Sequence, residues 1–146
     1  MSKMVATLAA LLFAWLPLTG MAENSTSIPG YIIHHNAFTT DTLSPEVARH
    51  YQLTRSKNRG MLNVSVIKGV PGTTGHSVRA EVTAQATNLA GQSREIALRE
   101  ITDGDAIYYI GDFRVADQET LNFTLQVTPE GSTESYTARL SQQFFI

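Results

Sequence analysis

Three cationic side chains alternate in one short polar stretch, and they are the residues best suited to bind a ligand. Arg55, Lys57 and Arg59 occupy every second position between a predicted helix and a predicted strand. In an extended loop all three would project to the same side and form a compact cationic patch. A guanidinium group binds a carboxylate or phosphate through two parallel hydrogen bonds. The spacing therefore predicts an anion site in this basic loop.

A structural role is the alternative for the same three cations. They could pair with Asp41, Glu46 or Asp112, or donate to loop carbonyls where the chain enters the sheet. Short charge runs at a protein surface are usually solvated or paired internally. Both interpretations stay open from the sequence. His34 and Asn36, in the first predicted strand, complete the set of candidate binding residues.

The histidines do not have the spacing of a metal site. His34 and His35 are adjacent, and neighbouring residues of a strand face opposite sides. We expect one of them to pack beneath the helix and the other to face solvent. None of the spacings typical of a histidine or acidic metal site occurs, and the chain has no cysteine. The sequence therefore predicts no metal and no cofactor.

Catalytic motifs are also missing from the sequence. It contains neither a Gly-x-Ser-x-Gly elbow nor a glycine-rich phosphate loop that leads into a helix. The acidic residues Glu100, Asp103 and Asp105 flank a hairpin turn, where such residues serve turn geometry and solubility. An envelope hydrolase, or another enzyme, is kept as an alternative. It would need a nucleophile and a base within about 3 Å of each other in a pocket.

The first 22 residues predict a signal peptide. Lys3 supplies a positive n-region, an apolar run extends from Val5 to Leu18, and small residues precede a cleavage site after Ala22. The apolar run is shorter than the roughly 20 residues that a membrane-spanning helix needs. We therefore expect residues 1–22 to be removed on export. Residues 23–146 have the length of a single domain with one ordinary core.

Composition excludes several classes of function. Without cysteine there are no disulfides, thiol nucleophiles or thiolate metal sites. Lys3 is the only one of the 11 lysines and arginines in the first 22 residues, so the remainder, with 13 acidic residues, is mildly acidic. The basic loop also lacks interleaved aromatic residues. Nucleic-acid binding is therefore not expected.

Residues 44–51 predict the one convincing helix. Ser44 can cap its first turn, and Pro45 suits the first helical position because the missing N–H is not needed there. Val47 and Tyr51 are spaced i and i+4 and predict a narrow apolar stripe. A helix of about two turns must be stabilised by packing on the rest of the domain.

Alternating apolar residues predict strands in the rest of the chain, separated by turns at the spacing typical of two-layer antiparallel folds. Residues 23–27 are expected to fray, 103–104 to form a tight hairpin, and Tyr108 and Tyr109 to face opposite sides. We predict an all-β, immunoglobulin-like antiparallel β-sandwich of about seven strands, with one short helix between the first two strands. A small antiparallel β-barrel is the alternative. The expected strands cover residues 31–38, 62–66, 78–86, 96–98, 107–115, 121–127 and 136–146.

Several segments of the chain resemble a family of small exported proteins of Gram-negative bacteria, which is catalogued as a numbered domain of unknown function. The resemblance covers essentially all of residues 23–146. It implies a periplasmic location and an all-β fold, and it implies no activity, cofactor or substrate. The segments are Tyr31-x-Ile-His-x-Asn-Ala37, Leu43-x-Pro-Glu-Val-Ala48, Arg55-Ser-Lys-Asn-Arg-Gly-x-Leu-Asn-Val-Ser-Val66, Ala86-Thr-Asn-Leu89 and Arg99-Glu-x-x-x-Gly-Asp-Ala-Ile-Tyr-Tyr-Ile110.

The leading hypothesis is a periplasmic binding or interaction module. Its basic loop would recognise a partner protein or an anionic ligand of the cell envelope, without a membrane span. The alternatives are an envelope hydrolase and a structural or chaperone-like envelope protein. The last of these would add a partner strand at an exposed edge, such as the last strand with residues 144–146.

Overall fold

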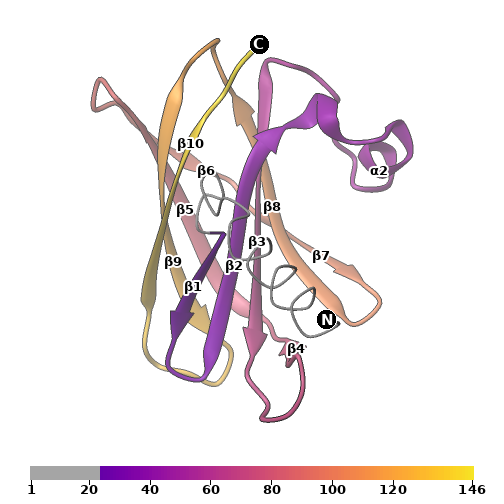
Figure 1. Ribbon diagram of the computed structural model, residues 1–146, viewed down its shortest axis with the longest axis vertical. Helices are drawn as coiled ribbons and strands as arrows, with labels where there is room; N and C mark the ends of the chain where they lie inside the picture. The colour runs from indigo at the N-terminus through magenta and orange to yellow at the C-terminus, as the bar shows by residue number, and fades with distance from the viewer. Residues whose placement is uncertain (1–23) are drawn as a thin grey trace, which may run out of the picture.

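Two antiparallel sheets packed face to face make up residues 24–146, which are the residues that the computed structural model describes (Figure 1). The predicted signal peptide, residues 1–22, lies outside this range. The six-stranded sheet contains, in spatial order, β1 (Ser25–Ile28), β2 (Tyr31–Thr39), β3 (Arg59–Lys68), β8 (Ala106–Arg114) and β7 (Arg99–Asp103), with β4 (His76–Ser77) paired to the end of β3. The four-stranded sheet contains β10 (Tyr136–Gln143), β9 (Thr120–Pro129), β5 (Ala80–Asn88) and β6 (Ser93–Ile96).

The predicted β-sandwich is therefore confirmed. Over residues 24–146 the two sheets are separate, which decides against the barrel alternative. Seven of the ten strands have five or more residues, and all of these except β7 correspond to strands expected from alternation. The three shorter strands, β1, β4 and β6, extend the sheets at positions where the sequence pattern is weak.

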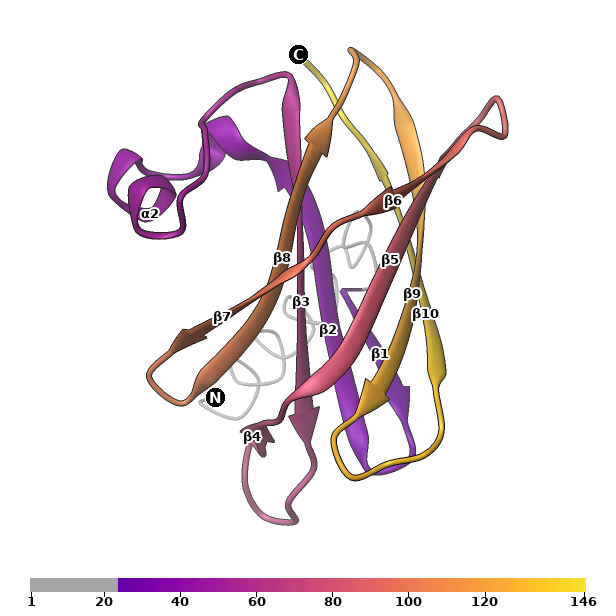
Figure 2. The same ribbon diagram turned by 180° about the vertical axis from the view of Figure 1, so that it is seen from behind.

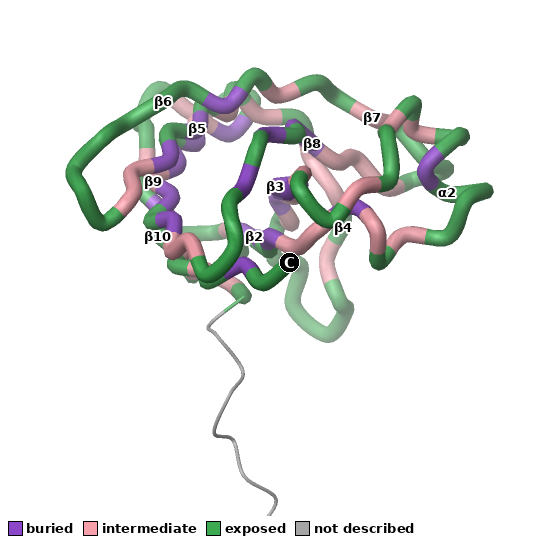
Figure 3. The backbone as a smooth tube through the Cα atoms, turned by 90° about the horizontal axis from the view of Figure 1, so that it is seen from above, coloured by how far each residue is buried: buried purple, intermediate pink, exposed green. Residues whose placement is uncertain are grey.

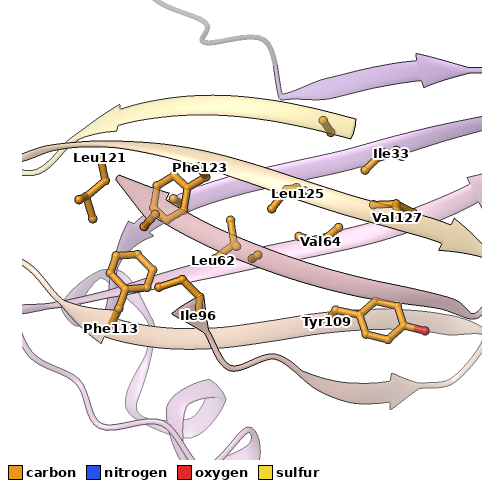
Figure 4. Packing of buried hydrophobic residues seen from close by; sticks show 14 of the residues in the cluster. Ile33, Leu62, Val64, Ile96, Tyr109, Phe113, Leu121, Phe123, Leu125 and Val127 are labelled. Carbon is orange, nitrogen blue, oxygen red and sulfur yellow. The ribbon is translucent and has the colours of Figure 1, made fainter. Parts of the chain in front are cut away.

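The core lies between the inner faces of the two sheets, as the view from above shows (Figure 3). Leu62, Val64 and Val66 of β3 are fully buried there, as their alternation predicts. At one end, the Phe113 ring contacts Phe123, with 5.4 Å between ring centroids (Figure 4). Gly60 lies opposite Phe113 in the register, and a Cβ atom at this position would collide with the ring.

The turn between β7 and β8 is the tight hairpin that Asp103-Gly104 predicts. Asp103 pairs with Ala106, and Gly104 has a φ of 59°, which glycine adopts without steric cost. The strand expected around Ile96 and Leu98 is wrong, because the chain changes sheet at this point. Ile96 pairs with β5 in one sheet, whereas β7 begins at Arg99 and pairs with β8 in the other.

Both ends of the described chain differ from expectation. Residues 25–28 pair with β2 as strand β1 instead of fraying, since Ile28 packs against the core and the Asn24 carbonyl accepts a hydrogen bond from the His35 N–H at 2.9 Å. At the other end, β10 stops at Gln143. Phe144 then turns into the core, where it is 2% exposed, so this segment does not extend the strand edge.

The excursion, which we define as residues 40–58, separates β2 from β3. It contains a 3-10 turn η1 (Thr40–Thr42) and helix α2 (Pro45–His50), which lies beside the β7–β8 edge of the sandwich (Figures 1 and 2). The Ser44 cap is confirmed, with its Oγ accepting the Val47 N–H at 3.2 Å. The predicted stripe is wrong: Val47 is 39% exposed, and Ala48 is the buried helix residue.

Candidate functional site

A buried hydroxyl group holds the backbone of the basic loop in place. Thr40 is fully buried, and its Oγ1 lies 2.7 Å from the Thr54 carbonyl oxygen and 3.1 Å from that of Ser56. The same oxygen accepts the Ser56 N–H at 2.8 Å. A buried hydroxyl group needs such partners to offset the loss of water. Thr40 therefore holds the two ends of the excursion together.

Arg55 has a structural role. Its Nε donates to the Leu43 carbonyl at 2.6 Å, and its Nη2 donates to the Asp41 carbonyl at 3.0 Å. This guanidinium group ties the basic loop to the residues that precede helix α2. Arg55 therefore follows the structural alternative. It bonds loop carbonyls, including the backbone carbonyl of Asp41, and not the Asp41 carboxylate.

Arg59 forms the ion pair with Asp112 that the structural alternative also named. Its Nη2 lies 2.7 Å from Asp112 Oδ2, and its Nε donates to the same oxygen at 2.9 Å. About a third of each side chain is exposed, so the pair adds little to stability. Its main consequence is that the guanidinium group of Arg59 is held in one orientation at the surface.

A depression of about 440 Å³ opens beside the oriented Arg59. Arg59 and Arg114 face each other in the β3–β8 register. Among the described residues, the exposed side chains of Arg114 and Lys57 have no hydrogen-bond or ion-pair partner. The depression therefore combines guanidinium, hydroxyl and amide groups, all of which can bind an anion. It is lined by Thr54, Ser56, Asn58, Arg59, Arg114 and Val115.

Arg114 was missed by the sequence analysis. It lies near the end of the predicted strand 107–115, and nothing in its local pattern indicates which residue lies opposite. The pairing with Arg59 depends on the register of two strands that are distant in the sequence.

His34 and Asn36 lie elsewhere, on the outer face of β2. They line a second depression of about 230 Å³, together with Asn24, His35, Asn63 and Ser65. The five residues predicted from sequence therefore do not form one site.

The two adjacent histidines face opposite sides of β2, as predicted. His34 is exposed, whereas His35 is 2% exposed and its Nε2 lies 2.9 Å from Thr26 Oγ1. The expectation that a histidine packs beneath the helix is wrong, because His35 packs against β1. The Thr26–His35 contact pairs a hydroxyl with an imidazole that is 2% exposed. We therefore assign this contact to the attachment of β1.

No group of three or more histidine and acidic residues within residues 24–146 is arranged to hold a metal ion. In the same part of the chain, no helix has the length and apolar character needed to span a membrane.

A third hollow, of about 150 Å³, lies between Tyr51 and the outer face of the six-stranded sheet. The Tyr51 hydroxyl donates to Asp103 Oδ2 at 3.1 Å, and its backbone carbonyl accepts a hydrogen bond from Arg99. Burial raises the pKa of Tyr51, and the hydrogen bond to Asp103 raises it further. Tyr108 lines this hollow while Tyr109 is buried in the core, so the prediction that they face opposite sides is confirmed.

Comparison with protein families identifies the chain. The model of the domain of unknown function DUF4426 matches residues 25–146. The chain belongs to the DUF4426 family. The structure is similar to a crystal structure of a DUF4426 family protein from Pseudomonas aeruginosa PAO1. That protein is 29% identical, with a TM-score of 0.71 over 86% of this chain and 97% of the other.

This DUF4426 protein also shares its fold with FetP of uropathogenic Escherichia coli strain F11. FetP expressed in the periplasm of E. coli is 10% identical, with a TM-score of 0.60 over 85% of this chain and 94% of FetP. A copper-bound FetP variant gives the same identity and TM-score over 84% and 95%. Identity this low shows the fold alone. A search of curated proteins finds no match to the sequence.

Proposed function

We propose that this DUF4426 protein is a periplasmic binding module that captures an anionic group through the depression beside its basic loop. The observation that carries the proposal is the arrangement of two arginines across one pair of strands. Arg59 is oriented by Asp112, and the guanidinium group of Arg114 has no hydrogen-bond or ion-pair partner among the described residues. Paired guanidinium groups flanked by hydroxyls and an amide suit a carboxylate or phosphate.

The loop that carries these groups is held in place before any ligand arrives. Thr40 and Arg55 fix its backbone through hydrogen bonds to carbonyl and N–H groups. A loop that is already ordered loses little conformational entropy on binding. The cations thus divide into two roles: Arg55 supports the loop, whereas Arg59 and Arg114 line the depression and Lys57 is exposed between two further lining residues, Ser56 and Asn58.

The periplasmic location rests on the predicted signal peptide and on family membership. The sequence of residues 1–22 has the three regions of a cleavable signal. The similarity to FetP, which was expressed in the periplasm, agrees with this location. The anionic ligand would then be an acidic patch of an envelope protein or a smaller anion of that compartment.

Affinity capture from periplasmic extract tests the proposal, with the chain from Glu23 as bait. We expect the native bait to retain a partner and a Lys57→Ala/Arg114→Ala double variant to lose it at an unchanged melting temperature. Arg139→Ala is the matched control, because Arg139 is an exposed cation on the other sheet without a partner in the described structure. Retention should also fall as salt is raised, since exposed charges are screened.

Two results would contradict the proposal. Equal retention by the double variant and the native bait would show that the basic loop is not the binding surface. If Arg139→Ala lost the partner to the same extent, retention would depend only on the overall charge of the bait. Titration with inorganic phosphate, followed by the backbone amide resonances of Thr54 to Asn58, separates a small anion from a protein partner.

A further inference from the structure

The outer face of the six-stranded sheet carries two hollows that the proposed anion site does not use. One lies beneath Tyr51, and the other lies beside His34 and Asn36. Asn63 lines both, so the two hollows adjoin at β3. We call this pair of adjoining hollows the outer-face groove.

The lining of the outer-face groove is neutral and amphipathic. No lysine, arginine, aspartate or glutamate is among the residues that line the two hollows. The hollow beneath Tyr51 is mostly apolar, with a second aromatic ring from Tyr108 and aliphatic side chains from Ile101 and Ile110. The other hollow is bordered by amide, hydroxyl and imidazole groups. A charged ligand would lose its hydration here without gaining an opposite charge.

Asn63 is the polar residue at the junction of the two hollows. Its Oδ1 is buried and has no hydrogen-bond partner in the described structure. A buried acceptor without a partner costs free energy, so such an atom is uncommon. A ligand hydroxyl or amide N–H that reached Asn63 would remove this cost. A few placed polar groups in a mostly apolar hollow are characteristic of small-molecule sites.

We propose that the outer-face groove binds a neutral saccharide chain. A sugar ring presents an apolar C–H face, which suits the rings of Tyr51 and Tyr108, and hydroxyl groups, which suit Asn63, Asn36 and His34. A peptide that adds as a strand is disfavoured here, because it needs a sheet edge. The backbone groups of β3 already pair with β2 and β8 on either side.

The position of Tyr51 over the groove is fixed by its two bonds to the edge strand β7. Asp103 holds its hydroxyl group and Arg99 holds its carbonyl. A ring fixed in this way presents a sugar with a flat apolar surface at little entropic cost. Tyr108 approaches from the sheet itself, so its substitution leaves the anchoring of Tyr51 intact.

The test is an NMR titration of the chain from Glu23 with two neutral tetrasaccharides, cellotetraose and chitotetraose. We expect at least one of them to shift the side-chain amide resonances of Asn36 and Asn63. Tyr108→Ala should weaken this binding at least tenfold, and Asn63→Leu should do the same. Asn122→Leu, on the outer face of the other sheet, should leave it unchanged, as should the Lys57→Ala/Arg114→Ala variant.

Several outcomes would overturn this inference. They are the absence of shifts at Asn36 and Asn63 with either sugar, and equal binding by the native chain and a folded Tyr108→Ala variant. Binding of a neutral peptide from a random library at these same residues, without saccharide binding, would also overturn it. Because the anion site uses other residues, failure here leaves the capture experiment on the basic loop unaffected.

Discussion

The two outer faces of the sandwich are built differently, although each belongs to an antiparallel sheet. On the four-stranded sheet the outward residues are polar, and neighbouring strands bond through them, as between Gln126 Nε2 and Thr137 Oγ1 at 3.0 Å. On the six-stranded sheet the outward residues include Met61 and Ile110, which are 5% and 3% exposed although they lie outside the core cluster. The polar residues facing outward on the four-stranded sheet include Thr83, Gln85, Thr87, Asn122, Thr124, Gln126, Thr137, Arg139 and Ser141.

This difference shows which outer face needs a cover against water. A polar outer face is what solvent alone requires of an antiparallel sheet. Apolar residues on an outer face need a cover, and here part of that cover is Tyr51, at the end of helix α2. The excursion is in turn held by polar contacts of Thr40, Arg55 and Tyr51. Both proposed binding sites lie on the covered face.

The largest effect is expected from Ile110→Ala on the covered face. Ile110 is 3% exposed, so truncation removes buried apolar contacts and enlarges the hollow beneath Tyr51. We expect a loss of about 2–3 kcal/mol of unfolding free energy, in the range of other buried Ile→Ala changes. Urea unfolding measures it. An effect below about 0.5 kcal/mol would mean that the excursion does not cover this residue in solution.

A smaller loss is expected from Thr40→Val, which keeps the shape of the side chain and removes the hydroxyl group. The Ser56 N–H and the Thr54 carbonyl would lose their buried partner, which typically costs about 1–3 kcal/mol. Amide hydrogen exchange of residues 54–58 should accelerate more than exchange in β9. Uniform acceleration across both sheets would instead indicate a global effect and would contradict a local role for Thr40.

These contacts mark the limit of prediction from sequence. Alternation identified the buried residues Leu62, Val64 and Val66, and local signals identified the Ser44 cap and the Gly104 hairpin, because each depends on neighbours in the chain. Pairings between segments that are far apart in the chain leave no pattern in the neighbouring sequence.

The missed features are of this non-local kind. Thr40 lies in a segment that the sequence predicts to be a loop. It is nevertheless fully buried, because residues 54–56 fold back over it. Arg114 joins the candidate site through register alone. The alternation of Ile96 and Leu98 does not reveal that the chain changes sheet between β6 and β7.

Tyr51→Phe should cost less, about 0.5–1.5 kcal/mol, because it removes one partly exposed hydrogen bond to Asp103. The contribution of this hydroxyl group should depend on pH. The pKa of Tyr51 is raised in the folded state above the ordinary value of 10.0, chiefly by burial. Its stabilising effect is therefore fully present below about pH 10 and is lost as the pH rises through the folded pKa.

Unfolding free energies of the native chain and Tyr51→Phe, measured from pH 8 to pH 11, test this dependence. The difference between the two proteins should shrink above about pH 10. A constant difference over the whole range would show that the Tyr51 hydroxyl is not held in its neutral form by the fold. Asp103→Asn is a useful companion, since it keeps a hydrogen-bond acceptor and removes the charge.

The smallest effect, and the one with the most informative sign, is expected from Asn63→Leu. Leucine removes the buried Oδ1 that has no hydrogen-bond partner, and it fits among the apolar residues of the hollow beneath Tyr51. Stability should therefore stay constant or rise by up to about 1 kcal/mol. Asn122→Leu on the polar outer face removes no such atom, so it should not stabilise the fold. If Asn63→Leu instead destabilises the protein by more than about 1 kcal/mol, Asn63 serves the fold. If stability is kept while saccharide binding is lost, the polar residue at the centre of the covered face is maintained for a ligand.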